Sequence, residues 1–243
     1  MAQSACVNWL FGRGLSISCN LTWAVPGDWR TLRREDQIGR IEKALPKEMA
    51  AAHVDTSVIR RFLDTISSRT NSAWRHRFVT TNWDYLLQRE VLRLGLTEVP
   101  SWMDNSHVFH INGTVEVLKD NSQRSAFVLE DDPSSARVST TEANVAWNKM
   151  LWDRLFVVIG MSFECEVDKF LLTALSRVED EMPIGESTWI VLNPAQRALG
   201  ATCERVQRKL PRAKVVRVLS TFAAWLESGM RELDGAGVLK TKG

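Results

Sequence analysis

The sequence predicts an α/β domain in which a parallel sheet is covered by helices on both faces. Short runs of β-branched and aromatic residues alternate with longer amphipathic stretches, which is the pattern of strands and crossover helices. Several of the short runs are apolar throughout, as strands buried on both faces are. The first run leads directly into a Gly-x-Gly turn at residues 12–14, which is typical of doubly wound, Rossmann-like domains.

Each element can be placed in order by its hydrophobic period. Strands are expected where apolar residues run together over about five positions: 7–11, 77–81, 108–111, 155–159, 188–192 and 215–219. Helices are expected where apolar residues recur every three or four positions: 36–44, 56–68, 85–94, 142–153, 166–178, 195–209 and 222–233. The two sets alternate along most of the chain, which favours a doubly wound sheet.

Two segments depart from this alternation. Residues 23–75 are mostly helical and follow the glycine turn without an intervening strand, so we expect a helical insertion that covers the site as a cap or small lobe. Residues 115–140 are polar, contain the run Asp-Asp-Pro-Ser-Ser at 131–135, and are predicted to form an exposed loop insertion. Residues 1–243 are therefore interpreted as one domain carrying two insertions.

Composition narrows the functional classes. The 31 Lys and Arg residues against 29 Asp and Glu give a net charge of +2, which argues against nucleic-acid binding through bulk electrostatics. The cysteines at 6, 19, 165 and 203 form no Cys-x-x-Cys pair, which excludes a zinc ribbon and disfavours a disulfide framework. No signal peptide is recognisable and the apolar runs are of strand length, so we expect a cytoplasmic protein that does not bind membranes.

The ten tryptophans raise the question of stacking on nucleobases. Most of them occupy apolar periodic positions, for example Trp9, Trp152, Trp189 and Trp225. Core packing is therefore the predicted role of these side chains.

Polar residues follow five of the predicted strands at the point where each strand ends. The segments are Gly12 to Ser16, Thr80 to Asp84, Asn112-Gly113, Gly160-Met161-Ser162 and Asn193-Pro194. Ligands of doubly wound sheets bind at the carboxyl ends of strands, so we expect these segments to line one crevice. For Asn82 and Asp84 an ordinary role as a helix N-cap explains the residue type equally well.

This ordered set of motifs resembles the sirtuin-like family, the silent information regulator type of NAD-consuming domain. The family pattern is Gly-Ala-Gly-x-Ser, Thr-x-Asn-x-Asp, His-Gly, Gly-x-Ser and an asparagine at a strand end, and the matches occur in the same order over most of this chain. The segments 80–84 and 159–163 look especially like a bacterial branch associated with NAD hydrolysis and phage defence. The resemblance implies an NAD site and hydrolysis of NAD to ADP-ribose and nicotinamide.

The resemblance also implies a role for each matching residue. The residues expected to bind NAD are Gly12, Arg13, Gly14, Ser16, Thr81, Asp84, Gly160, Ser162 and Asn193. The glycine turn would present N–H and hydroxyl groups to the pyrophosphate. The Gly160 turn would hold phosphate or the nicotinamide-side ribose, and Asn193 would contact the adenosine ribose. Asn82 would orient a ribose hydroxyl or the attacking water, while Asp84 would help to place the nicotinamide amide.

Two departures from the family pattern bear on catalysis. Asn112 stands where the family has its histidine, and an amide cannot take a proton near neutral pH. His110 lies two residues upstream, on the same strand face by the period of two, and is the candidate substitute base. Arg13 replaces the family's alanine, and its guanidinium would either grip the pyrophosphate or occupy the nicotinamide side of the cleft.

Missing features exclude other activities. Family deacylases carry a four-cysteine zinc module after the His-Gly strand, and residues 114–140 contain no cysteine, so we expect no zinc and disfavour protein deacylation. The third glycine of a Gly-x-Gly-x-x-Gly dehydrogenase fingerprint is also absent, because position 17 is Ile17. Two hypotheses follow: an NAD hydrolase, or a regulatory module that binds NAD or ADP-ribose without turnover. In either case control would come from self-assembly or from a sensor protein acting in trans.

Overall fold

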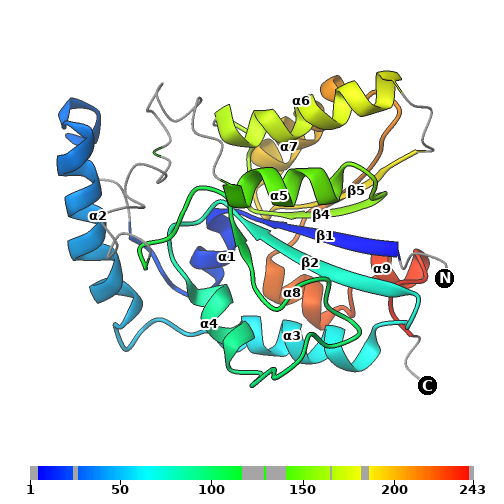
Figure 1. Ribbon diagram of the computed structural model, residues 1–243, viewed down its shortest axis with the longest axis horizontal. Helices are drawn as coiled ribbons and strands as arrows, with labels where there is room; N and C mark the ends of the chain where they lie inside the picture. Colours follow the sequence, from blue (N-terminus) through cyan, green and yellow to red (C-terminus); the bar gives the residue numbers. More distant parts are fainter. Residues whose placement is uncertain are drawn as a thin grey trace.

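The computed structural model describes residues 5–23, 27–116, 129, 141–164, 166–181 and 186–240. Within these residues the chain forms one six-stranded sheet with helices on both of its faces (Figure 1). All of the strand pairings are parallel. The predicted α/β, doubly wound fold class is therefore confirmed.

Every predicted strand is present: those at 155–159 and 188–192 have the predicted ends, and the ends of the others are displaced by up to three residues. The strands are β1 Ala5–Phe11, β2 Trp74–Thr80, β3 Phe109–His110, β4 Leu155–Ile159, β5 Thr188–Leu192 and β6 Lys214–Val218. β3 is the shortest because the chain turns directly after His110, where the Gly113 N–H donates to the His110 carbonyl and Gly113 has φ +78°.

The strand order explains where a ligand would bind. The sheet runs β3-β2-β1-β4-β5-β6, so the chain starts in the middle, builds outward to one edge, and then returns to build the other half. This is the order of a doubly wound dinucleotide-binding sheet, whose crevice opens at the carboxyl ends of the two central strands. Those strands are β1 and β4.

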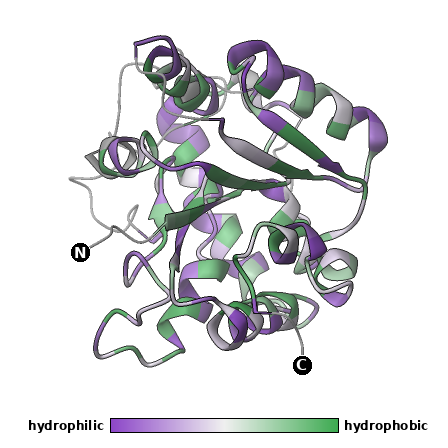
Figure 2. Cartoon of the chain, turned by 90° about the vertical axis from the view of Figure 1, so that its right-hand side faces the viewer, coloured by the Kyte–Doolittle hydropathy of each residue, from purple (hydrophilic) through white to green (hydrophobic). Residues whose placement is uncertain are grey.

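Side-chain alternation gives each face of the sheet its own core. Trp9 and Phe11 of β1 point to the face covered by α3 (Ser57–Arg69) and α8 (Phe222–Glu227), and the rings of Trp9 and Phe62 lie 4.6 Å apart. Leu10 points to the other face, towards α5 (Thr141–Met150), α6 (Glu166–Glu181) and α7 (Gln196–Lys209). Figure 2 shows the resulting apolar strands between helices whose outer faces are hydrophilic.

Some predicted helices have different limits. The predicted helix at 222–233 is two helices, α8 and α9 (Arg231–Gly235), because Gly229 adopts φ +89° and Met230 adopts φ +55°. The N–H of Met230 bonds to the Trp225 carbonyl and that of Gly229 to the Leu226 carbonyl, which is a Schellman helix end. A short helix that the sequence did not indicate, α1 (Arg13–Ser18), begins inside the glycine turn.

The two segments expected to be insertions are described only in part. Helix α2 (Arg34–Met49) stands apart at the carboxyl side of the strands, beyond α1, whereas α3 packs against the sheet as a crossover helix (Figure 1). Most of the predicted polar insertion, residues 117–128 and 130–140, lies outside the described residues. Val115 and Leu129, which belong to it, are buried in the core, so these two positions are not part of an exposed loop.

Two further helices complete the description: α4 (Leu86–Leu92), which follows the Asn82 segment, and the 3-10 turn η1 (Trp29–Thr31), which precedes α2. The core role predicted for Trp152 is wrong, because its side chain is 57% exposed after α5 ends at Met150. Trp9, Trp189 and Trp225 are buried as predicted. None of the helices in the described part of the chain is long and apolar enough to cross a membrane.

Candidate functional site

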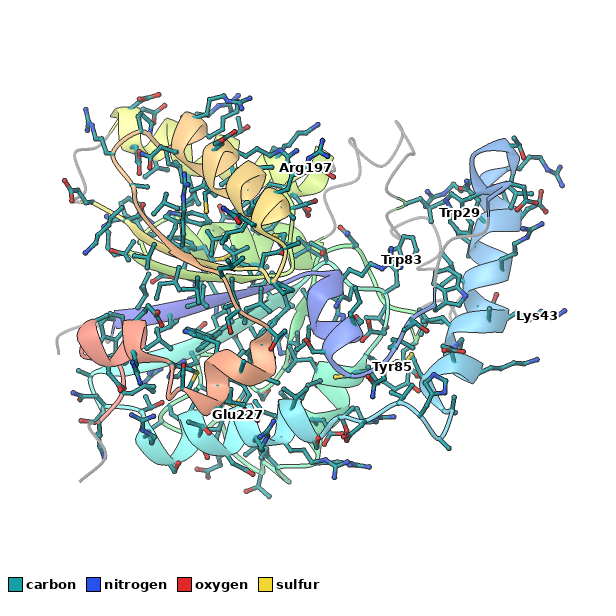
Figure 3. The ribbon with its side chains drawn as sticks, turned by 180° about the vertical axis from the view of Figure 1, so that it is seen from behind. Trp29, Lys43, Trp83, Tyr85, Arg197 and Glu227 are labelled. Atoms are coloured by element: carbon teal, nitrogen blue, oxygen red, sulfur yellow. The ribbon has the colours of Figure 1, made fainter. Side chains whose placement is uncertain are left out.

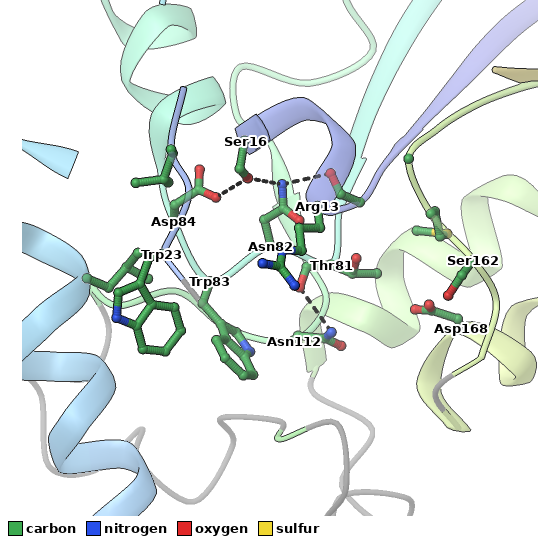
Figure 4. Close-up of a pocket in the computed structure, with 15 residues that line it drawn as sticks. Arg13, Ser16, Trp23, Thr81, Asn82, Trp83, Asp84, Asn112, Ser162 and Asp168 are labelled. Carbon is green, nitrogen blue, oxygen red and sulfur yellow. Dashed lines mark hydrogen bonds between the residues drawn. The ribbon is translucent and has the colours of Figure 1, made fainter. Parts of the chain in front are cut away.

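A cavity of about 360 Å³ opens at the carboxyl ends of β1, β2 and β4, where the strand order predicts a ligand (Figure 4). The predicted site residues that line it are Gly12, Arg13, Ser16, Thr81, Asn82, Asp84, Asn112, Gly160 and Ser162. Gly14, His110 and Asn193 are not among its lining residues. Segments far apart in the sequence are thus brought together at one place.

The glycines are required by the contact between two backbone turns. A Cβ built on Gly12 would lie 2.5 Å from the Gly160 carbonyl oxygen, and one built on Gly14 would lie 2.6 Å from the Gly160 Cα. Gly160 itself has φ +63°, and a Cβ there would lie 2.3 Å from the Gly14 Cα. No side chain fits in these contacts, so the turn after β1 and the turn after β4 can meet only as glycines.

This contact corrects the expectation that the glycine turn presents its N–H groups to a pyrophosphate. The Gly12 N–H donates to the Ile159 carbonyl at 2.9 Å, and the Gly14 N–H donates to the Gly160 carbonyl at 3.4 Å. The Leu15 N–H donates to the Gly12 carbonyl at 3.0 Å. The first two donors join the turn after β1 to β4 and its turn, and the third is used at the start of α1, so these three N–H groups already have acceptors.

Asn82, Ser16 and Asp84 form one hydrogen-bonded chain along the wall of the cavity (Figure 4). The Asn82 Nδ2 donates to the Gly12 carbonyl at 3.0 Å and to the Ser16 Oγ at 2.9 Å. The Ser16 hydroxyl donates to Asp84 Oδ2 at 2.6 Å. The Asn82 amide is therefore held in one orientation, and Ser16 acts by positioning its neighbours.

Asp84 is not the N-cap of α4, which is Tyr85, but its side chain bonds to the backbone at the start of the helix and also lines the cavity. Its Oδ1 accepts the Leu86 N–H at 3.1 Å at the start of α4. Burial raises the pKa of the Asp84 carboxyl, and the hydrogen bonds from Ser16 and from the backbone oppose that rise. Asp84 is therefore a buried carboxyl group at the carboxyl ends of the strands.

Asn112 supplies an acceptor with no partner. Its Nδ2 donates to the Thr81 carbonyl at 3.0 Å, and Thr81 in turn donates its N–H to the Phe11 carbonyl. The side chain is 8% exposed, and its Oδ1 makes no hydrogen bond with any residue that the structure describes. A buried acceptor left this way is costly unless a ligand or water satisfies it.

The side chain of Arg13 contributes a positive charge to the cavity. The residue is exposed at the start of α1, and its guanidinium points into the cavity between Asn82 and Trp83 (Figure 4). No ion pair or hydrogen bond joins it to another residue in the described ranges. The opposite wall carries Ser162 and Asp168, the latter on α6.

An aromatic wall that the sequence did not predict closes the cavity on the side of α2. Trp23 and Trp83 line the cavity together with Leu21 and Leu45. The rings of Trp23 and Trp83 lie 6.3 Å apart, and Trp29 lies 6.3 Å from Trp83 on the α2 side (Figure 3). The sequence does hold one indication of this wall. Trp83 lies between Asn82 and Asp84, and both of these neighbours line the same cavity.

His110 lies elsewhere. Its side chain lines a separate hollow of about 650 Å³ beside α4, with Tyr85, Gln88 and Arg89. Burial lowers the pKa of His110 to about 4, and a backbone hydrogen bond with Asn82 partly opposes this. The prediction that His110 and Asn112 share a strand face fails because the strand ends at His110 and the turn sends Asn112 to the other cavity. We assign His110 no part in the chemistry of the first cavity.

The remaining strand end is polar but lies outside the cavity. Asn193 follows β5, and its Oδ1 accepts the Ala195 N–H at 2.9 Å, which is a local turn ahead of α7. Helix α7, which follows Asn193, also holds the loop after β4. Its Arg205 donates to the Ser162 carbonyl at 2.9 Å and pairs with Glu164. In the part of the chain that is described, no group of three or more His, Cys, Asp or Glu side chains could hold a metal ion.

Comparisons with known proteins add little to this geometry. No family model matches the sequence, and a search of curated proteins finds no match. Among solved structures the chain is similar to one described as the structural basis for the mechanism and regulation of Sir2 enzymes. The identity is 13%, 97% of this chain and 94% of that chain are covered, and the TM-score is 0.49. A similarity of this size carries no argument about function.

Proposed function

We propose that this cavity binds NAD and that the chain hydrolyses it slowly to ADP-ribose and nicotinamide. The observation that carries the proposal is the convergence of the strand-end motifs on a cavity in which the buried Oδ1 of Asn112 has no partner among the described residues. Leaving such an acceptor unsatisfied costs about 1–3 kcal/mol. A ribose hydroxyl is a donor that satisfies it.

The remaining walls suit the other parts of NAD. Trp23 and Trp83 offer flat apolar faces to the nicotinamide ring, and a cationic ring is favoured against tryptophan. The cavity of about 360 Å³ is at the lower end of small-molecule sites and takes the nicotinamide half. The adenosine half would extend across the carboxyl ends of the strands towards β5, where Asn193 follows the strand.

Hydrolysis breaks the bond between ribose C1′ and the nicotinamide nitrogen, and the bonding electrons leave with nicotinamide. The oxygen of water then bonds to C1′, and one water proton is released. The Asp84 carboxylate stabilises the positive charge that develops on the ribose, while Asn82 and Asn112 orient the hydroxyls and the water. Among the described residues no histidine lines the cavity to take the proton, so we expect the reaction to be slow.

The test is nicotinamide release from NAD, followed chromatographically with the purified protein. Asn82→Ala should lower the rate at least tenfold, because it removes the amide that joins Gly12 to Ser16 and orients the reacting groups. Asn71→Ala is the matched control. Asn71 precedes β2 at the amino ends of the strands, away from the cavity, and its Oδ1 accepts only the Ala73 N–H among the described residues. Equal rates for wild type and Asn82→Ala would contradict the proposed site.

A second candidate is a module that binds NAD or ADP-ribose without turnover. The placement of His110 outside the cavity favours it, because Asn112 then has no base beside it. Saturable binding in calorimetry without nicotinamide release would establish this alternative, and absence of binding by both ligands would exclude both functions.

The motif resemblance also suggests a biological role for NAD consumption. NAD consumption would give the chain a role in defence against phage, under the control of self-assembly or of a partner protein. Protein deacylation is not part of the proposal, because residues 114–140 lack the cysteines of a zinc module.

A further inference from the structure

The anion-binding capacity of the cavity is concentrated in one side chain. Arg13 is the only Lys or Arg among the residues that line the cavity in the described part of the chain. Its guanidinium points into the cavity in Figure 4, and it makes no ion pair or hydrogen bond with another described residue. An exposed arginine that serves only the fold is usually paired or lies along the surface, so this placement requires a function.

Several backbone donors around Arg13 are already used within the protein. The N–H groups of Gly12, Gly14 and Leu15 are bonded to the carbonyls of Ile159, Gly160 and Gly12. The Gly160 N–H faces the Leu192 carbonyl at 3.5 Å. A phosphate in this cavity therefore finds a guanidinium with its fork of donors, whereas these four amides already have acceptors.

We propose that Arg13 holds the diphosphate of the nucleotide, so that affinity depends on one guanidinium rather than on the amides of the glycine turn. The inference rests on the proposed function, since it assigns a residue to the phosphates of that same ligand. Asn112 provides an independent second contact, because its buried Oδ1 is free to accept a sugar hydroxyl beside the phosphates. The ligand class is a nucleoside diphosphate with an exposed ribose, such as ADP-ribose or NAD.

The carboxylates of the cavity do not cancel this role. Asp84 already accepts hydrogen bonds from the Ser16 hydroxyl and the Leu86 N–H, and it lies on the wall with Trp23 and Trp83. Asp168 lies on the opposite wall beside Ser162. The negative charges therefore flank the two ends of the cavity, and Arg13 lies between them.

The experiment is calorimetric titration with ADP-ribose and with nicotinamide riboside, which has a ribose but no phosphate. Arg13→Gln should weaken ADP-ribose binding by about tenfold to a hundredfold and leave nicotinamide riboside binding within twofold. Arg13→Lys should weaken ADP-ribose binding less, because an ammonium keeps the charge and loses the fork. Raising the salt concentration should weaken ADP-ribose binding to the wild type and have little effect on Arg13→Gln.

Arg61→Gln is the matched control, because it removes one exposed positive charge from α3, where Arg61 pairs with Glu227. It should bind ADP-ribose as the wild type does. Equal binding by Arg13→Gln and wild type would overturn the inference and leave the proposed function standing. Tighter binding by Arg13→Gln would also overturn it, since Arg13 would then be filling the cavity. Failure of the wild type to bind either ADP-ribose or NAD would overturn both.

Discussion

At the scale of single residues, steric contact explains Gly12, Gly14 and Gly160 before any ligand is considered. Their backbones touch where the turns after β1 and β4 meet, and the same contact shapes the floor of the cavity. The sequence located these residues because they follow apolar runs. It could not show that their N–H groups are used within the protein, since that depends on the distance between two strands adjacent only in space.

Gly160→Ala should therefore destabilise the fold by on the order of 3 kcal/mol. The added Cβ would lie 2.3 Å from the Gly14 Cα at a residue with φ +63°. Gly39→Ala is the control, because nothing lies within 4 Å of its Cβ position inside α2, and it should be neutral or stabilising by up to about 1 kcal/mol. Urea denaturation measures both, and equal midpoints would contradict the described contact.

The orientation of side chains was the least predictable property at this scale. His110 and Asn112 are two residues apart, yet they line different cavities, because the period of a strand applies only while the strand continues. The pairing of Ser16 with Asp84 joins residues 68 positions apart and has no local signal.

At the scale of elements, apolar runs predicted the strands well because strands buried on both faces have no polar side. The predicted helix at 222–233 is longer than α8 because the apolar period continues through Gly229, whereas the backbone turns there. Contacts between helices were not predictable, and the clearest example joins α3 to α4. Glu90 of α4 accepts hydrogen bonds from Thr56 at 2.6 Å and from Arg60 at 2.9 Å.

Glu90→Gln should cost about 2 kcal/mol, because a buried carboxylate loses its charge among cationic donors. Burial alone would raise the pKa of Glu90, but the bonds from Thr56 and Arg60 hold it below its ordinary value. Glu227→Gln breaks the neighbouring pair with Arg61, in which both side chains are at least half exposed, and should change stability by less than about 0.5 kcal/mol. Thermal or urea unfolding of the two variants makes the comparison, and similar losses would refute the assigned difference.

At the scale of the whole molecule, the strand order places the cavity at the point where the two halves of the sheet diverge. The alternation of strands and helices predicted the fold class. It also predicted that the polar segments gather at the carboxyl ends of the strands. The aromatic wall was not predictable, because α2 and the residues before it reach the cavity only through the tertiary fold.

Stability of the whole fold should fall with acid. Burial lowers the pKa of His76 from 6.5 to about 3 and that of His110 to about 4, so both rings stay neutral while the unfolded chain takes up protons. The Trp9 indole donates to His76 Nδ1 at 2.8 Å, which keeps the His76 ring in its neutral form. The contribution is complete above pH 6.5 and is lost as the pH falls towards 4.

Between pH 7.5 and 5.5 the two histidines together should lower the free energy of unfolding by about 3 kcal/mol. Urea denaturation across this range measures the slope. His76→Gln should remove about half of it, because glutamine does not titrate. A slope unchanged in His76→Gln would show that other groups cause the acid sensitivity.

We propose that the cavity is an NAD site whose turnover is limited by Asn112. The most direct measurement is the rate of nicotinamide release from NAD by wild type and Asn112→His. Histidine can keep the bond to the Thr81 carbonyl through Nδ1 and present Nε2 to the cavity as a base. We expect slow release by the wild type and an increase of about 10² in the variant. No release by either protein would contradict it.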